Sequence, residues 1–212
     1  MPRVLIAISS CQSYEETGLN QPLRDTWLPE AVALGMDYRF FHGRSARPRH
    51  DVVLVDANDA YYDLTSKFKE KIRWALLQEY DYMFTCLADC YASAERLVHS
   101  GFEKYDYFGN VFCHPGGRPY CQGGPGCFLS KKAMQRLGQT QSNYPNDDCW
   151  TGDVLAEHAD VIRRDSKDFV WMGHLDGPKP TNTYITAHLS NADGGYKPEL
   201  MHKAHREWKG LR

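Results

Sequence analysis

Short apolar runs that alternate with helical stretches constrain the fold of this chain most. The apolar and aromatic bias typical of buried strands occurs in residues 3–10, 36–41, 52–55, 80–92, 105–112 and 127–130. Helices are expected between these runs, at residues 21–34, 64–80, 93–100, 131–137 and 151–158. Strands that alternate with helices predict an α/β fold, with a mainly parallel (mixed) central sheet flanked by helices on both faces.

Residues 64–80 carry the clearest helical pattern. The apolar residues Phe68, Ile72, Ala75 and Leu76 recur at spacings of three and four. The charged residues Lys67, Lys69, Glu70 and Lys71 are expected on the opposite, solvated face.

Length and charge indicate one domain without a dominant electrostatic partner. The 212 residues are enough for one domain with a good core, and we expect a basic tail at about residues 195–212. The net charge of −2 gives no overall field that selects nucleic acid or membrane. The basic segments at residues 42–50 and in the tail are expected to be solvated, or alternatively to contact an anionic acceptor or a diphosphate.

The chain contains no stretch that is typical of a membrane span or a signal peptide. Its seven cysteines have no regular disulfide or zinc-site spacing, which is typical of reduced thiols. We therefore expect a cytoplasmic protein.

Asp89 is the polar residue at the end of the apolar run 80–92. In open α/β sheets, ligands bind beyond the carboxyl ends of the strands, so Asp89 is a candidate metal ligand. The alternative is that Asp89 caps the helix expected at residues 93–100.

Two further features could join Asp89 in one site. Asp147 and Asp148 precede an expected helix, and adjacent carboxylates repel, which raises one pKa and favours a general base near neutral pH. The alternative is an ordinary acidic helix start. His188 and His174 lie in the late loop region, and one imidazole with the Asp89 carboxylate would suit Mn²⁺ or a similar ion that bridges two phosphates.

Glycine is concentrated at residues 123–126. The sequence Gly-Gly-Pro-Gly is neither a Walker loop nor a dinucleotide-binding loop. It is either a plain turn or a place where the backbone approaches a ligand closely.

Six short motifs occur at residues 24–27, 59–67, 82–92, 123–130, 146–152 and 170–189. In this order they resemble the motifs of glycosyltransferase family 31, the group of β-1,3-galactosyltransferases and Fringe. Each motif is weak alone, but six in order are strong together, and the likeness covers most of the chain. The residues that resemble the family lie at 24–27 (R-x-T-W), 59–67 (D-x-Y-x-N-L-T-x-K), 82–92 (a strand ending in D-D-D-x-Y-V), 123–130 (G-G-G-Y-x-L-S), 146–152 (P-D-D-C-T-x-G) and 170–189 (the late histidine segment).

The resemblance implies a GT-A fold and inverting transfer of a hexose or N-acetylhexosamine from a UDP-sugar. Asp89 matches the last acid of the metal-binding triple and His188 the late metal-binding histidine, with His174 the second choice. Asp148 matches the catalytic base and Asp147 the acid beside it. The ion implied is Mn²⁺ or Mg²⁺, and the donor contacts are expected from Arg24, Asp56, Lys67, Gly123 and Gly124.

This chain departs from the family at Leu87 and Ala88, which replace the first two acids of the triple. Metal binding should then depend more on His188, the diphosphate and water, and a nucleotide-sugar or glycan-binding module without catalysis is the alternative function. Family members are mostly anchored in the Golgi, so this chain is either a piece without its anchor or a cytoplasmic enzyme of a microbe or virus. The acceptor is expected to be a glycan, a protein, a small molecule or a hydroxymethylated base of viral DNA.

Overall fold

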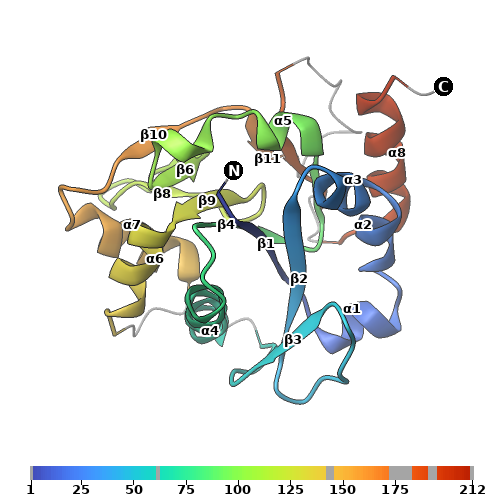
Figure 1. The fold of residues 1–212 in the computed structure, drawn as a ribbon, viewed down its shortest axis with the longest axis horizontal. Coiled ribbons are helices and arrows are strands. Elements are labelled where there is room, and N and C mark those ends of the chain that lie inside the picture. The colour runs from blue at the N-terminus through green and yellow to red at the C-terminus, as the bar shows by residue number, and fades with distance from the viewer. Residues whose placement is uncertain (1, 61–62, 142–145, 172–182, 191–194, 211–212) are drawn as a thin grey trace.

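The structure is a computed structural model that describes residues 2–60, 63–141, 146–171, 183–190 and 195–210. A seven-stranded sheet forms its centre, in the order β10-β6-β9-β4-β1-β2-β3 (Figure 1). Only β9 is antiparallel to its neighbours, β4 and β6. The strands span Val4–Ser9 (β1), Met36–Gly43 (β2), Val52–Val55 (β3), Tyr82–Leu87 (β4), Tyr107–Gly109 (β6), Cys127–Ser130 (β9) and Arg163–Asp165 (β10). The expected α/β fold with a mixed, mostly parallel central sheet is confirmed.

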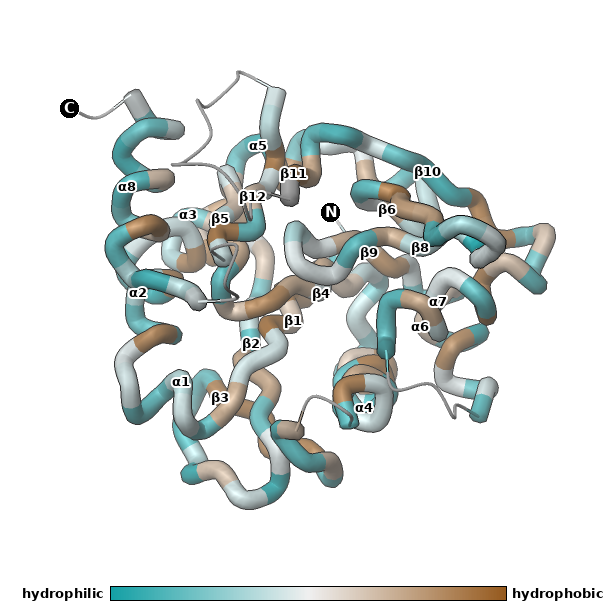
Figure 2. The backbone as a smooth tube through the Cα atoms, turned by 180° about the vertical axis from the view of Figure 1, so that it is seen from behind, coloured by the Kyte–Doolittle hydropathy of each residue, from teal (hydrophilic) through white to brown (hydrophobic). Residues whose placement is uncertain are grey.

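Two layers of helices cover the sheet because its central strands are apolar on both faces. In β1, Ile6 and Ile8 pack into one buried cluster and Leu5 and Ala7 into the other. Figure 1 shows α4, α6 and α7 on one side of the sheet and α2, α3 and α8 on the other. Figure 2 colours the backbone by hydropathy, and the central strands β1, β4 and β9 carry brown, hydrophobic residues. The helices span Gln12–Glu16 (α1), Gln21–Asp25 (α2), Trp27–Ala33 (α3), Leu64–Leu77 (α4), Ala94–Val98 (α5), Lys131–Gly138 (α6), Asp147–Ala156 (α7) and Pro198–Trp208 (α8).

A second, three-stranded sheet continues from the carboxyl end of β4. It has the order β11-β12-β5, formed by Phe169–Trp171, Thr186–His188 and Cys90–Ala92. The expected strand at 80–92 is therefore two strands, β4 and β5, separated at Ala88 and Asp89. The run at 105–112 is likewise divided, into β6 and β7 (Val111–Phe112), and β7 pairs with β8 (Tyr120–Cys121).

The helix expected at residues 21–34 is broken. Thr26, with φ −118° and ψ −98°, separates α2 from α3. Pro29 has no N–H to donate to the carbonyl of Asp25, and its ring would clash with that carbonyl in a continuous helix. The Thr26 hydroxyl donates instead to the Pro22 carbonyl at 2.6 Å.

The basic tail expected at about residues 195–212 keeps its described basic side chains half-buried or exposed, but most of it forms a packed helix, α8. Helix α8 buries Met201 and Ala204 against α2 and β5, and the Trp208 ring lies 5.0 Å from that of Tyr91. The apolar residues Leu200, Met201, Ala204 and Trp208 recur at helical spacing among the basic ones. No helix of the described ranges is long and apolar enough to cross a membrane.

Candidate active site

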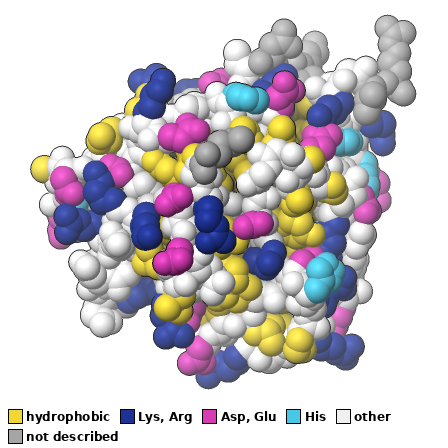
Figure 3. Space-filling view, viewed as in Figure 1, with side chains coloured by type: hydrophobic (Ala, Val, Ile, Leu, Met, Phe, Trp, Pro, Cys, Tyr) yellow, Lys and Arg dark blue, Asp and Glu magenta, His cyan; other side chains and the backbone are white. Residues whose placement is uncertain are grey.

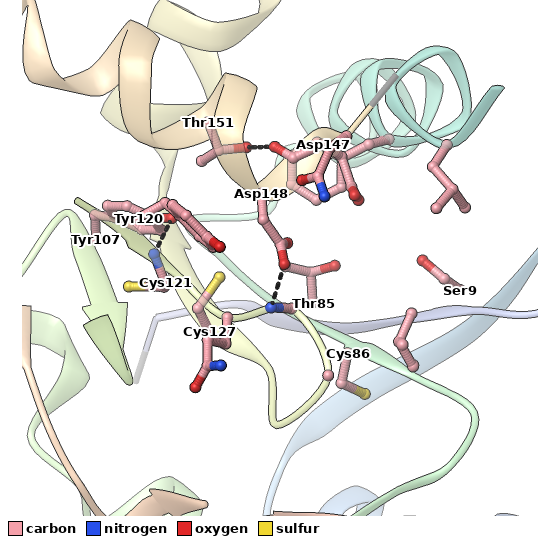
Figure 4. Close-up of a pocket in the computed structure, with 17 residues that line it drawn as sticks. Ser9, Thr85, Cys86, Tyr107, Tyr120, Cys121, Cys127, Asp147, Asp148 and Thr151 are labelled. Carbon is pink, nitrogen blue, oxygen red and sulfur yellow. Dashed lines mark hydrogen bonds between the residues drawn. The ribbon is translucent and has the colours of Figure 1, made fainter. Parts of the chain in front are cut away.

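Two adjoining cavities lie beyond the carboxyl ends of β1 and β4. The first, which we call the Asp148 cavity, has a volume of about 290 Å³ and is lined by Asp147, Asp148, Gly123 and Gly124 among others (Figure 4). The second, the Asp89 cavity, has a volume of about 250 Å³. Both cavities are lined by Ser9, Leu64 and Leu87, so they are two halves of one cleft at the edge where α/β sheets bind ligands.

Helix α7 brings Asp147 and Asp148 into the first cavity. The helix begins at Asp147, earlier than the expected residue 151, because the side chain of Asn146 caps it by accepting from the N–H of Cys149 at 3.0 Å. Both carboxylates therefore lie in the first turn, where the helix dipole favours negative charge. In Figure 4 the two acids enter from α7, and Ser9 and Thr85 line the strand side of the same cavity.

The electrostatics of the pair favour a base that titrates near neutral pH. Burial raises the pKa of Asp148 to about 8, and the negative charge of Asp147 adds to the increase. The N–H of Gly123, which donates to Asp148 Oδ2 at 2.8 Å, and the charge of Lys71 oppose it. Burial also raises the pKa of Asp147, against the attraction of Lys71. One carboxylate of the pair therefore ionises at a pH near neutrality. A pKa close to the working pH is what an efficient general base needs.

Gly123 has no room for a side chain. A Cβ at this position would collide with Oδ1 of Asp148 and would lie 3.2 Å from its Cγ. The glycine-rich stretch is therefore a close approach of the backbone to Asp148, in addition to being a turn closed by a hydrogen bond from Gly126 to Gly123.

We expect Gly123→Ala to displace the Asp148 carboxylate and to lower any activity that depends on it by about 100-fold, the cost of a misplacement of about 1 Å. The thermal melting midpoint should change little, because the cavity gives the carboxylate space to move. Gly138→Ala is the matched control, since its Cβ would meet only Ile72 and Leu76, at 3.9 Å. Equal activity of the two variants would show that the Gly123–Asp148 contact does not position a reactive group.

Asp89 lines the second cavity, and its expected partner His188 lies against it, behind the lining. Asp89 Oδ2 lies 3.1 Å from His188 Nε2, and both side chains are largely buried. The register that pairs His188 with Cys90 across β12 and β5 brings the two residues together, and Leu189 N–H donates to the Asp89 carbonyl at 2.9 Å. Helix α5 begins at Ala94, five residues later, so the interpretation of Asp89 as a helix cap is wrong.

The donor atoms of this pair fit two ligands of one divalent ion. Ligands at about 2.1 Å from an octahedral ion, at right angles, are about 3.0 Å apart. Asp89 Oδ2 and His188 Nε2 are 3.1 Å apart, and Asp89 Oδ1 is buried without a hydrogen-bond partner. Within the described ranges no group of three acidic, histidine or cysteine side chains could hold an ion, so a bound ligand or water would have to supply the other ligands.

Lys67, one of the expected donor contacts, also lines the Asp89 cavity. Its ammonium donates to the carbonyl of Ser10 and, at 2.6 Å, to Asp59 Oδ1. Asp59 accepts as well from the N–H of Gly43 at 2.7 Å, which fixes the carboxylate at the mouth of the cavity.

Two of the expected donor contacts lie elsewhere. Arg24 lines neither cavity; it forms ion pairs with Glu15 at 2.6 Å and Asp51 at 2.7 Å. Asp56 lies on the surface with a 79% exposed side chain, 3.2 Å from Arg44. Asp59, three residues later, provides the acid that lines the cleft, and the motif at residues 59–67 already contained it.

Sequence reasoning missed Lys71. The side chains expected on the solvated face of α4 include Lys67 and Lys71, but both are buried. Lys71 Nζ donates to Ser9 Oγ and to Thr85 Oγ1, each at 2.7 Å. The signal was available, because Lys67 and Lys71 are four residues apart and flank Phe68 and Ile72 on the same helix face.

His174 lies outside the described residues, so the second choice of histidine ligand stays a prediction. A comparison with models of known protein families finds no match to this chain, and neither does a comparison with curated proteins.

Proposed function

We propose that this chain is a GT-A-type inverting glycosyltransferase, similar to family 31, that moves a hexose or N-acetylhexosamine from a UDP-sugar to an acceptor hydroxyl. The observation that carries the proposal is the divided cleft. A carboxylate with a raised pKa, Asp148, lines one half, and Asp89, in contact with His188, lines the other. The ordered family motifs and the mixed α/β sheet support the same proposal.

The two halves of the cleft match the two substrates of such a transfer. The nucleoside diphosphate would occupy the Asp89 cavity, where Lys67 provides positive charge. The sugar and the acceptor hydroxyl would meet in the Asp148 cavity, on the other side of Ser9, Leu64 and Leu87. Asp89 and His188 would hold Mn²⁺ or Mg²⁺, and the bound ion would offset charge on the leaving diphosphate.

In the chemical step Asp148, ionised, accepts the proton of the acceptor hydroxyl. The acceptor oxygen forms a bond to the anomeric carbon from the face opposite the diphosphate. The bond between the anomeric carbon and the diphosphate oxygen breaks, UDP leaves with its electron pair, and the configuration is inverted. The Gly123 N–H keeps the carboxylate directed into the cavity while the proton is transferred.

The acceptor proposed is a glycan, a small molecule, a protein or a hydroxymethylated base of viral DNA, in the cytoplasm. Figure 3 shows basic and acidic side chains intermingled on the face in view, without a continuous basic surface there. The residues at positions 87 and 88 support a second candidate function. Leu87 and Ala88 stand where the resembled enzymes have two acids, which favours a nucleotide-sugar or glycan-binding module without catalysis.

The deciding experiment incubates the protein with each common UDP-sugar, Mn²⁺ and a panel of glycan, nucleoside and DNA acceptors. We expect UDP release that depends on one donor and rises with the right acceptor. Calorimetry with the same donors runs in parallel. UDP-sugar binding without release in any combination would favour the binding module, and neither binding nor release would overturn both functions.

A further inference from the structure

A buried lysine lies beneath the catalytic half of the cleft. Lys71 is 1% exposed and belongs to α4, one turn after Lys67. Its two hydrogen bonds reach hydroxyls on neighbouring parallel strands, Ser9 on β1 and Thr85 on β4, and both hydroxyls line the Asp148 cavity. The two hydroxyls hold the ammonium at the floor of that cavity.

Neither hydrogen-bond partner neutralises the lysine. Hydroxyl oxygens are uncharged, and a buried ammonium without a counter-ion is strongly unfavourable. The carboxylate with the largest electrostatic effect on it is Asp147 on α7, which lines the same cavity as the two hydroxyls but lies beyond direct ion-pair distance of the ammonium. Lys67, the next cation, is already paired with Asp59. Lys71 and Asp147 thus supply one positive and one negative charge to the same buried region.

The other titratable groups that face this region add no cation to it. They are Cys86 on β4, Cys127 on β9, Tyr107 on β6, Cys121 and Tyr120 on β8, and Cys149 on α7. Burial raises the pKa of Cys127, Tyr107 and Cys121, which keeps these groups neutral at pH 7. Two carboxylates therefore share one ammonium, and only one of them can be fully neutralised.

We propose that Lys71 is a positioning residue that serves as the buried counter-ion of Asp147, so that Asp148 is left as the only proton-accepting carboxylate of the cavity. Asp148 is the member of the pair bonded to the Gly123 N–H, and burial beside the charge of Asp147 makes its own ionisation unfavourable. The catalytic role in this assignment rests on the proposed function. The electrostatic coupling between Lys71 and the two carboxylates does not, because it is present in the protein without substrate. It gives the two neighbouring acids different tasks.

The test is a double-mutant cycle on Lys71 and Asp147, read by ¹³C NMR titration of the Asp148 carboxyl without substrate. Removing the cation in Lys71→Met should raise the pH at which Asp148 ionises, by about one to three pH units. Removing the neighbouring charge in Asp147→Asn should lower it. The double variant lacks both charges and should return close to the parent protein, because the two effects oppose each other.

Two controls separate charge from packing. Arg73→Met removes a cation from the exposed side of the same helix, away from the cavity floor, and should leave the titration unchanged. Ser9→Ala keeps the ammonium but removes one hydroxyl partner, and should shift it less than Lys71→Met. If Lys71→Met does not fold, Asp147→Asn and the double variant carry the test, since the double variant contains neither buried charge.

The acid limb of kcat/KM should follow the same shifts, since it reports the base of the free enzyme. An Asp148 titration that is unchanged in Lys71→Met, or single-variant shifts that add instead of cancelling, would overturn the assignment even in an active transferase. The predicted shifts in a protein that transfers no sugar would instead overturn the proposed function and leave the charge assignment standing.

Discussion

Asp148→Asn is expected to lower kcat/KM for sugar transfer by about 10²- to 10⁴-fold, the usual contribution of a general base. The amide is nearly isosteric and its oxygen can still accept the Gly123 N–H, so the cavity should keep its shape. It cannot take up the proton of the acceptor hydroxyl at neutral pH. UDP affinity should stay within about twofold, because the diphosphate is expected in the Asp89 half of the cleft. Initial rates of UDP release, with calorimetry of UDP binding, measure both effects.

Asp153→Asn provides the matched control. Asp153 lies on the same helix α7 but does not line the Asp148 cavity. We expect this variant to keep the activity of the parent protein. Full activity of Asp148→Asn would show that Asp148 is not the base. If Asp147→Asn lost activity in the same assay, Asp147 would be the base instead.

Much of the fold follows from local sequence patterns. The apolar run 3–10 predicts β1 because its residues are buried on both faces, which is what a central parallel strand requires. The pattern at residues 64–80 predicts α4, and Ser130 is the N-cap of α6, with its hydroxyl accepting from the N–H of Ala133. These elements depend on short-range periodicity and capping, which one sequence displays directly.

The pairing of Asp89 with His188 depends on register. It follows from the alignment of β5 with β12, and a slip of one residue would turn His188 to the other face of its strand. Periodicity within either strand does not determine that register. The family resemblance named both residues, whereas the residues alone left Asp89 between a helix cap and a ligand.

The Lys71 site was missed because side-chain type was used as a guide to burial. Lysine is rarely buried without a partner, and its partners here come from β1, β4 and α7, which no local pattern connects to α4. Residue type was also an insufficient guide for Asp56 and Asp59. Both acids follow the strand β3, but only Asp59 lines the cleft, whereas Asp56 is exposed. In both cases the decisive contacts join residues distant in sequence.

Asp89→Asn is expected to abolish the dependence of UDP binding on Mn²⁺. In the parent protein Mn²⁺ should tighten UDP binding by on the order of 100-fold, corresponding to about 3 kcal/mol. An asparagine keeps the size of the side chain but lacks the negative charge that attracts a divalent ion. Calorimetry of UDP with Mn²⁺, and with a chelator in its place, gives the two affinities whose ratio is compared between variants.

Asp56→Asn is the control for charge, since Asp56 is exposed and lies outside both cavities. Its ratio of affinities should equal that of the parent protein. His188→Gln should resemble Asp89→Asn, because it removes the second donor atom while keeping a polar side chain. If UDP bound the parent protein equally well with and without Mn²⁺, the 3.1 Å contact of Asp89 with His188 would be a structural hydrogen bond. Lys67 would then be the remaining cation of the Asp89 cavity for the diphosphate, and Lys67→Met would be expected to remove the affinity that Asp89→Asn leaves intact.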